Sequence, residues 1–318
     1  MRGLMTVFRK ELADSFTSWR FIILFAMVFL GGLFTLYVDN QNMRGEMSGT
    51  TEFVFLNLYT TSDPNLPGML QFLNLIAIFF VPIVGIALGF DAINEERNTG
   101  TMSRLLSQPI YRDAVINGKF LSGVVTIAIM MTSIVVIVAG AGLSMIGVPP
   151  GPEEINRLIF YLAITIFYGA FWLGLSILFS IFFRRVATSV LASLAIWIFL
   201  FFFMPMIAGI VANGMVPVDQ NSTTQVLLKN LGVQSTVLQF SPVRLYQEAV
   251  SVLLVPGART LGQTIQILGS GGAGLLPTPL SLGQSLLIVW PNLVSIVALT
   301  TILLAISYAR FMREEIRA

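Results

Sequence analysis

The sequence predicts an all-α polytopic membrane protein with six transmembrane helices, and three observations lead to that fold class. Only 11% of the 318 residues are charged, against about 25% in an ordinary soluble domain. Hydrophobic residues make up 55% and the mean hydropathy is +0.83, so the chain has more apolar surface than one core of this length buries in water. Six stretches are also long and apolar enough to cross a bilayer as helices.

The six predicted spans contain no Asp, Glu, Lys or Arg, apart from Arg157 at an edge. They cover residues 21–38, 69–90, 120–147, 157–183, 189–213 and 286–309. An even number of spans places both termini on one side of the membrane. Thirteen of the 18 Lys and Arg residues fall in short segments on that side, and the other five are spread over longer loops on the opposite side. The positive-inside rule therefore predicts cytoplasmic N and C termini.

The first 20 residues are expected to form an amphipathic helix in the cytoplasmic interface. Their large apolar side chains recur every four residues, and the charged ones lie elsewhere on the turn. The apolar positions are Leu4, Phe8, Leu12 and Phe16, with Trp19 on the same side. Acidic residues precede the first span and no small-residue cleavage site follows it, so we expect the span to be retained. The pattern leaves open whether the interfacial helix only anchors the chain or also moves.

The stretch between the last two spans, residues 214–285, is expected outside the membrane as an extracytoplasmic helical segment. Residues 225–240 and 243–255 have helical apolar spacing, separated by Pro242, and are expected as amphipathic helices on the outer face. A Gly-rich connector follows them. Three roles stay open for the segment: binding an extracytoplasmic protein at residues 225–255, capping an exit path, or lying on the lipid surface.

The composition excludes several classes of function. Without Cys or His the chain has no disulfide, no imidazole or thiolate metal ligand and no Cys or His nucleophile. Uncharged spans argue against an ion-coupled carrier or pump, which holds its cation on an intramembrane ionisable group. No catalytic, cofactor-binding or metal site is predicted, and the net charge of +2 indicates no nucleic-acid partner. We therefore expect the chain not to be an enzyme.

Polar and small residues inside the spans are expected to pack helices together rather than to bind a substrate. The polar or amphipathic candidates are Asn74, Thr165, Tyr168, Ser176, Ser193 and Trp197. Gly85 and Gly89 have the four-residue spacing of a close helix contact. Pro82 and Pro205 are expected to kink their helices. The Phe-rich stretch 199–203 would suit an apolar substrate, but contact with lipid is the favoured interpretation.

The cytoplasmic loop between the second and third spans, residues 91–119, has the chemistry of a docking surface. Gly100 interrupts an acidic turn, and Thr101 can cap a short helix that a proline ends. This helix would present Leu105–Leu106 on the surface. Because a solvated loop has no reason to expose two adjacent leucines, we expect a protein contact here.

The same loop resembles that of ABC-2-type permeases, the membrane subunits of many bacterial and archaeal ABC transporters. The likeness rests on Glu-Glu-Arg-x-x-Gly-Thr at 95–101, Leu-Leu-Ser-x-Pro at 105–109 and Gly-Lys at 118–119. Phe-Arg-Lys-Glu-Leu at 8–12 is similar to the interfacial helix of that family. Phe-Ser-Pro-x-x-Leu at 240–245 resembles a segment of the NosY-like branch, from nitrous-oxide reductase maturation.

The resemblance implies a permease that works with two ABC ATPase subunits and a second permease subunit, either an identical chain or a paralogue, in the plasma membrane of a prokaryote. The loop is then a coupling helix seated in a groove of the ATPase, and export is the expected direction. The residues implied in that contact are Glu95, Glu96, Arg97, Gly100, Thr101, Arg104, Leu105, Leu106 and Pro109. The chain has no Walker A sequence, so ATP and Mg²⁺ are expected on the partner ATPase.

Two other functions stay open on sequence alone. A non-transporting membrane scaffold would link a cytoplasmic protein at Leu105–Leu106 to an outer protein at residues 225–255. The other hypothesis is an ion-coupled carrier or channel, which the uncharged spans disfavour. Coupling to ATP hydrolysis separates the transporter from the scaffold, and proton-driven uptake without ATP would indicate the carrier.

Overall fold

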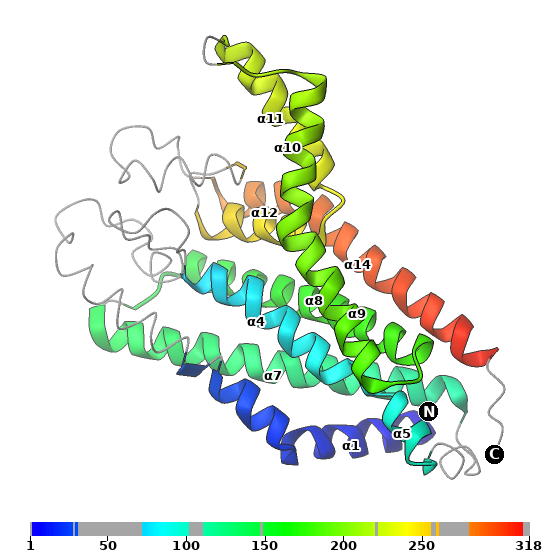
Figure 1. The fold of residues 1–318 in the computed structure, drawn as a ribbon. Helices are drawn as coiled ribbons and strands as arrows, with labels where there is room; N and C mark the ends of the chain where they lie inside the picture. Colours follow the sequence, from blue (N-terminus) through cyan, green and yellow to red (C-terminus); the bar gives the residue numbers. More distant parts are fainter. Residues whose placement is uncertain are drawn as a thin grey trace.

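The described part of the chain consists of helices and turns without a strand. The computed structural model describes residues 2–27, 29–30, 72–101, 111–146, 149–219, 222–255, 259–260 and 280–313. The helices are α1 (Arg2–Thr17), α4 (Phe72–Gly89), α5 (Asn94–Asn98), α7 (Arg112–Ile146), α8 (Pro152–Phe182), α9 (Val186–Ile198), η1 (Phe199–Phe203), α10 (Met204–Met215), α11 (Thr224–Leu238), α12 (Pro242–Leu254) and α14 (Leu282–Met312). The N-terminal end of α1 and the C-terminal end of α14 lie at the same end of the bundle as α5 (Figure 1).

Five helices in the described ranges are long and apolar enough to cross a membrane. They correspond to the second to sixth predicted spans, and they confirm the all-α polytopic fold. α7, α8 and α14 contain 35, 31 and 31 residues, so they extend beyond the predicted spans. Of the first predicted span, residues 21–27 and 29–30 are helical, and its other positions lie outside the described residues.

α8 forms the centre of the bundle. Nineteen of its 31 residues are buried, and α4, α7, α12 and α14 pack around it. α4 approaches closely because two of its glycines face α8. A Cβ atom at Gly85 would lie 2.9 Å from the carbonyl oxygen of Gly169, and one at Gly89 would lie 2.9 Å from that of Leu173. The predicted close contact of these two glycines is therefore confirmed.

The fifth predicted span is a continuous run of α9, η1 and α10, in which η1 is a π-helical turn just before Pro205. A proline ring collides with the carbonyl group four residues earlier, here that of Phe201, and a wider turn relieves the collision. The carbonyl of Leu200 in the same turn accepts the hydroxyl of Ser241 at 3.4 Å. The distortion predicted at Pro205 thus takes the form of a π turn, whereas Pro82 lies inside a continuous α4.

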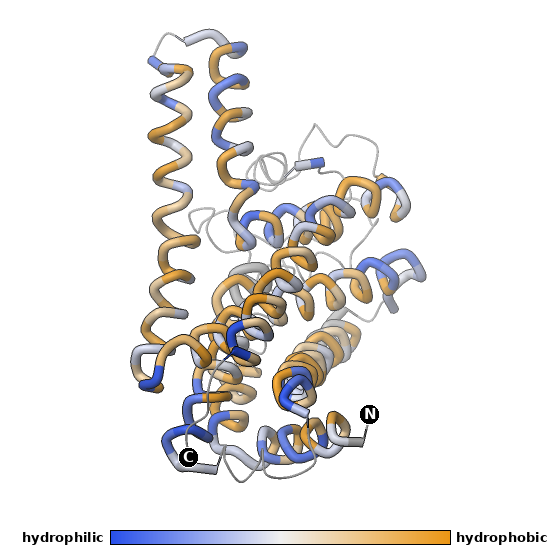
Figure 2. Tube along the Cα trace, turned by 90° about the vertical axis from the view of Figure 1, so that its right-hand side faces the viewer, coloured by the Kyte–Doolittle hydropathy of each residue, from blue (hydrophilic) through white to orange (hydrophobic). Residues whose placement is uncertain are grey.

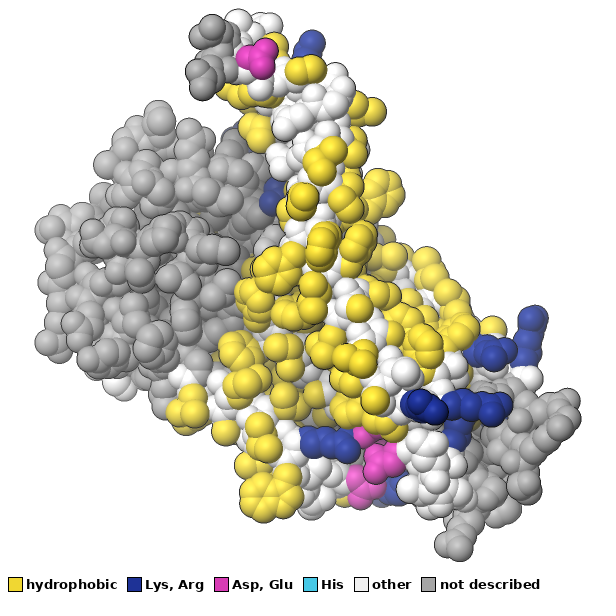
Figure 3. Space-filling view, viewed as in Figure 1, with side chains coloured by type: hydrophobic (Ala, Val, Ile, Leu, Met, Phe, Trp, Pro, Cys, Tyr) yellow, Lys and Arg dark blue, Asp and Glu magenta, His cyan; other side chains and the backbone are white. Residues whose placement is uncertain are grey.

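Apolar side chains cover the exposed surface of this helical run (Figure 3). Its exposed aromatic side chains are Phe199, Phe202 and Phe203, and Met206 and Ile210 of α10 are exposed as well. Charged side chains instead gather near α5 and the C-terminal end of α14 (Figure 3), and the hydropathy of the chain follows the same division (Figure 2). An apolar band next to a charged end is the pattern of a protein that faces hydrocarbon and then water.

α12, one of the two amphipathic helices expected in residues 225–255, is buried in the bundle. Ten of its 13 residues are buried, and it packs against α8 and α14. Tyr246 stacks on Tyr168 of α8 with ring centroids 4.2 Å apart, and its hydroxyl lies 3.0 Å from that of Thr165. The amphipathic spacing was interpreted correctly as a helix. Its apolar face, however, is covered by the bundle rather than by lipid or a partner.

Arg157 closes the end of the bundle opposite to α5. Its side chain is fully buried and donates to the carbonyl oxygens of Leu253 at 2.9 Å and Leu280 at 2.5 Å. It also donates to the hydroxyl of Ser285 at 3.2 Å and pairs with Glu153 at 2.8 Å. One cation thereby joins the start of α8 to the end of α12 and the start of α14.

α10 and α11 form an antiparallel hairpin that projects away from the bundle (Figures 1 and 2). The amide of Asn230 on α11 donates to the side chain of Asn213 at 2.9 Å and to the carbonyl of Val216 at 2.8 Å. Leu227 and Leu228 are exposed on α11. The stretch 225–255 therefore divides into an exposed α11 and a buried α12.

Candidate functional site

α5 is a five-residue helix whose first turn is held by α8. Its N-cap residue, Ile93, gives no side-chain hydrogen bond. The hydroxyl oxygen of Ser180 on α8 instead accepts the backbone N–H groups of Ile93 and Asn94, at 3.0 and 3.1 Å. N–H groups at a helix start have no intrahelical partner, so Ser180 caps α5 from another element. Gly100 follows α5 with φ of +70°, a conformation that favours glycine.

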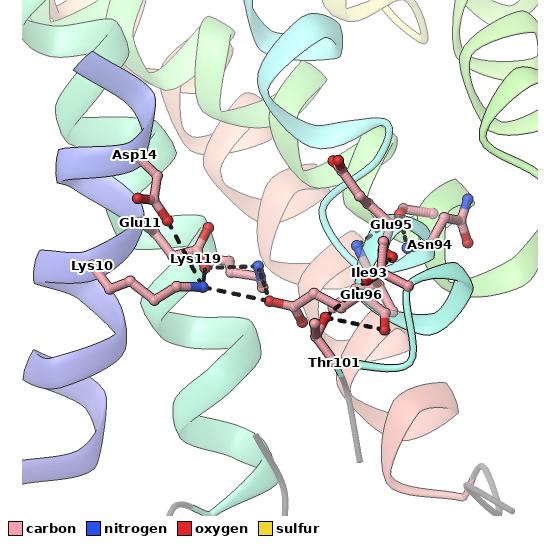
Figure 4. Close-up of polar contacts among 11 residues, drawn as sticks. Lys10, Glu11, Asp14, Ile93, Asn94, Glu95, Glu96, Thr101 and Lys119 are labelled. Carbon is pink, nitrogen blue, oxygen red and sulfur yellow. Dashed lines mark hydrogen bonds and ion pairs between the residues drawn. The ribbon is translucent and has the colours of Figure 1, made fainter. Parts of the chain in front are cut away.

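Four charged side chains, Lys10, Glu11, Glu96 and Lys119, form what we call the Lys119 cluster, which joins α1, α5 and α7 (Figure 4). The ammonium of Lys119 lies 2.9 Å from a carboxylate oxygen of Glu11 and 2.9 Å from one of Glu96. Lys10 lies 3.3 Å from Glu11 and 4.0 Å from Glu96. The Lys119 side chain is 6% exposed and that of Lys10 is 55% exposed. Lys119 is therefore the buried centre of the cluster and Lys10 its solvated edge.

The charges of the cluster keep Glu11 ionised. Burial by itself would raise the pKa of its carboxyl group, but the ammonium of Lys119 and, more weakly, that of Lys10 bring the pKa below the ordinary value of 4.5. The carboxylate in turn pairs Lys119, which is the last charge before the predicted span 120–147. An unpaired ammonium at that depth would lose hydration without compensation.

α1 packs directly on α7 next to Lys119. A Cβ atom at Gly118 would lie 2.8 Å from the Cγ1 atom of Val7, which is 3% exposed. Val7 and Glu11 are four residues apart, so they share the face of α1 that is turned to α7. The expected apolar row of α1 is only partly buried, and Trp19 is 77% exposed. The predicted helix is confirmed, and its position in the membrane interface stays a prediction.

A second ion pair ties the bend after α1 to the end of α4. Arg20 pairs with the largely buried carboxylate of Asp91, and its guanidinium lies 5.4 Å from the ring centroid of Phe90. Arg20 follows a short interruption of the helix at Ser18. The N-terminal segment is thus held by charge at two places, one on each side of this bend.

The predicted coupling residues fall into three groups. Glu96 belongs to the Lys119 cluster, and Arg97 donates to the carbonyl of Ile181 at 3.1 Å, so both side chains make contacts inside the protein. Glu95, Gly100 and Thr101 are exposed. The remaining four, Arg104, Leu105, Leu106 and Pro109, lie outside the described residues. The short helix expected around the two leucines stays a prediction.

Sequence reasoning assigned no role to Glu11 and Lys119, which hold α5 in place. Two signals point to them. Glu11 lies one helical turn after the buried Val7, and Lys119 directly precedes 27 residues without Lys, Arg, Asp or Glu, residues 120–146. A charge at the edge of such a stretch needs a partner. Neither signal identifies Glu96 as that partner.

The polar residues of the spans make contacts between helices. The Ser176 hydroxyl donates to the carbonyl of Ile86 at 3.0 Å, and that of Ser193 donates to Ser176 at 3.5 Å. Trp197 packs edge-on against Phe79 with ring centroids 5.5 Å apart. Together with the Thr165 and Tyr168 contacts to α12, these confirm the packing interpretation. The side chain of Asn74 lies outside the described residues.

The fold and the site together define a polytopic α-helical membrane protein in which the Lys119 cluster joins three helices at one end of the bundle. Among the residues that the structure describes, no group of three or more His, Cys, Asp or Glu is placed to hold a metal ion. The Lys119 cluster and the Ser180 cap hold one short helix against three long ones.

Residues 5–316 match the family described as ABC-2 family transporter protein. The match covers nearly the whole chain, so the chain belongs to this family and is a membrane permease component of an ABC transporter. The family also implies association with an ABC ATPase. A comparison with curated proteins gave no match.

Proposed function

We propose that the chain is the permease subunit of an ATP-driven exporter and that α5, with the segment after it, receives the force of a separate ATPase. The observation that carries this proposal is that α5 is attached to the bundle on one side and exposed on the other. Its capped start and its Glu96 and Arg97 side chains are held by α7 and α8, while Glu95 and Thr101 are exposed. A helix that is exposed on one side and fixed on the other passes a push on its exposed side into the bundle.

The ATPase belongs to another polypeptide in this proposal. The sequence has no Walker A motif, so ATP and Mg²⁺ bind to two ABC ATPase subunits, and a second permease subunit completes the transporter. Leu105–Leu106 supplies apolar contact area to the ATPase, and Glu95 and Arg104 orient the contact electrostatically. The excess of Lys and Arg supports a cytoplasmic position for the α5 end in the plasma membrane of a prokaryote.

An extracytoplasmic protein is the proposed partner of the opposite end. α11 is the part of residues 225–255 that is available for such a contact, because α12 is buried in the bundle. Leu227 and Leu228 are exposed on it, on a hairpin that projects from the bundle. The resemblance of residues 240–245 to the NosY-like branch supports a partner of this kind.

Two matched variants test both contacts. One carries Leu105→Asp and Leu106→Asp, and the other carries the same change at the exposed pair Leu227 and Leu228. Each chain is purified from membranes of the native host, bound proteins are identified by mass spectrometry, and ATP hydrolysis is measured in nanodiscs. The first variant is expected to lose an ABC ATPase and its activity. The second is expected to keep the ATPase and lose an extracytoplasmic protein.

The outcomes separate transporter from scaffold. If no nucleotide-binding protein associates with the native chain, or if the first variant keeps the ATPase, the coupling proposal fails. If proteins bind at both ends and ATP changes neither the complex nor its activity, the chain is a scaffold. Circular dichroism of both variants shows whether the helices persist, so a lost partner is not mistaken for unfolding.

A further inference from the structure

α5 is attached to the rest of the protein in two different ways. Hydrogen bonds hold it to α8, because the hydroxyl oxygen of Ser180 accepts backbone N–H groups at its start and Arg97 donates to the carbonyl oxygen of Ile181. Ion pairs of Glu96 with Lys119 and Lys10 link it to α7 and α1. The first attachment fixes the backbone of α5, whereas the second reaches elements on the other side of it (Figure 4).

α1 and α7 behave as one unit at this point. The close contact between Val7 and Gly118 lies directly beside Lys119, and the Glu11–Lys119 ion pair reinforces it. Glu11 and Lys119 are 108 positions apart in the chain. The direct pair of Glu96 with Lys10 is longer, at 4.0 Å, and Lys10 is largely exposed, so a displacement of Glu96 acts on α1 and α7 mainly through the ammonium of Lys119.

Glu96 lies between two ammonium groups, those of Lys119 and Lys10. Lys119 already carries two carboxylates, and Lys10 lies 4.0 Å from Glu96 with a largely exposed side chain. The second carboxylate oxygen of Glu96 is buried without a hydrogen-bond partner in the described ranges. A small shift of α5 toward Lys10 therefore keeps the Glu96 carboxylate between two ammonium groups, and its ion pair with Lys119 is not broken.

Asn94 is the second buried polar residue of α5. Its side chain is fully buried, and neither its amide nitrogen nor its amide oxygen has a hydrogen-bond partner in the part of the chain that the structure describes. A contribution to stability is a weak reason for the protein to retain the Lys119 cluster, since buried ion pairs are often replaced by apolar residues without loss of stability.

We propose that Lys119 is a positioning residue that transmits displacement of α5 to α1 and α7, with Glu96 as the group that moves and Glu11 as the group that stays bound. This inference rests on the proposed function, because the ATPase supplies the displacement. α1 is then a moving part of the transport cycle rather than only an anchor.

The absence of native cysteine allows the motion to be measured with two cysteines introduced at will. Ile155 is exposed at the end of α8 far from α5 and serves as the reference position. One labelled pair joins it to Asn98→Cys on α5, and the other joins it to Ala13→Cys on α1; both sites are exposed. Labelled chains are diluted into unlabelled ones in nanodiscs, the ATPase is added, and single-molecule energy transfer is recorded with and without ATP and vanadate.

In the native chain both pairs are expected to shift when ATP and vanadate are added. Lys119→Met is expected to keep the α5 shift and to lose the α1 shift, with ATP hydrolysis no longer coupled to the permease. Lys119→Arg is expected to restore the α1 shift, because arginine also pairs with two carboxylates. A purely structural role predicts instead that both shifts persist or that both disappear.

Each other outcome overturns the inference in a recognisable way. If α1 still follows α5 in Lys119→Met, Lys119 is not the link, and the proposed coupling function stands. If α5 does not shift in the native chain although the ATPase is bound, the proposed function fails and the inference fails with it. If both shifts vanish in Lys119→Met while its thermal stability falls, the residue is structural.

Discussion

Glu11 and Glu96 are distant in sequence, yet their carboxylates bind the same ammonium group. The reason is local to each residue. Glu11 shares a helix face with Val7, which is buried against α7, and Glu96 lies on a helix whose start is fixed by Ser180. Both carboxylates are thereby placed next to the ammonium group of Lys119. The Lys119 side chain is only 6% exposed, so it has little access to water.

The lowered pKa of Glu11 makes the stability of the protein depend on pH. Because the pKa in the folded state lies below the ordinary value of 4.5, the stabilisation is fully present above about pH 4.5 and is lost as pH falls through the folded pKa. Glu11→Gln is therefore expected to melt below the native chain at pH 7, with the difference shrinking in acid. Thermal unfolding in detergent from pH 7 to pH 3 measures it. A difference that does not change over this range contradicts the ion pair.

At the scale of elements, small residues decide which helices approach closely. Gly85 and Gly89 put the backbone of α4 against α8, and Gly118 admits Val7 between α1 and α7. Hydrogen bonds complete these contacts where polar groups remain, as between Ser176 and Ile86. The bundle is thus held by close backbone contacts and buried hydroxyls, which suits helices in a membrane.

Gly89→Ala is expected to destabilise the chain, because the new Cβ atom would lie 2.9 Å from the carbonyl oxygen of Leu173 and from Cβ of Ser176. Overpacking of this kind costs about 1–3 kcal/mol. Gly140→Ala is the matched control, since nothing lies within 4 Å of its Cβ position, and alanine favours the helix. Thermal unfolding in detergent is expected to lower the midpoint for Gly89→Ala and to keep or raise it for the control. Equal midpoints would show that α4 and α8 do not pack as described.

At the scale of the whole molecule, the two ends of the bundle are built from different elements. α5, the N-terminal end of α1 and the Lys119 cluster lie at one end (Figures 1 and 4), and Arg157 joins α8, α12 and α14 at the other. The α10–α11 hairpin projects away from both α12 and α8 (Figures 1 and 2). Removing it therefore leaves the buried contacts of the bundle in place.

Replacing residues 210–233 by a short Gly-Ser linker tests this independence. The cut sites are close, because a Cβ atom at Gly209 would lie 4.0 Å from the side-chain nitrogen of Gln234. The free energy of unfolding of the shortened chain is expected to lie within about 0.5 kcal/mol of that of the native chain, as for changes at an exposed surface. The shortened chain is also expected to keep its ATPase. Thermal unfolding and co-purification measure both. A large loss of stability would place the hairpin in the structural core.

The predictable part of the fold is the part that depends on local composition. Five predicted spans appear as long helices because an uncharged apolar stretch satisfies its backbone within a membrane only as a helix. The turn at Gly100 and the helices of residues 225–255 follow equally from local pattern. The burial of α12 does not follow from local pattern, because an amphipathic pattern identifies an apolar face without saying which surface covers it.

The sequence predicted where in the chain the candidate site lies, but not all of the residues that form it. Glu95–Thr101 could be found from its charges and its glycine, whereas Glu11 and Lys119 come from other helices. By itself, the sequence determined a membrane-spanning helical chain, since the hydropathy of a stretch of residues is a local property. Only the tertiary structure decided that Glu96 faces Lys119 and that α12 is buried. Pairing of charges and covering of faces depend on which distant helices pack together, and that choice is made by the whole bundle.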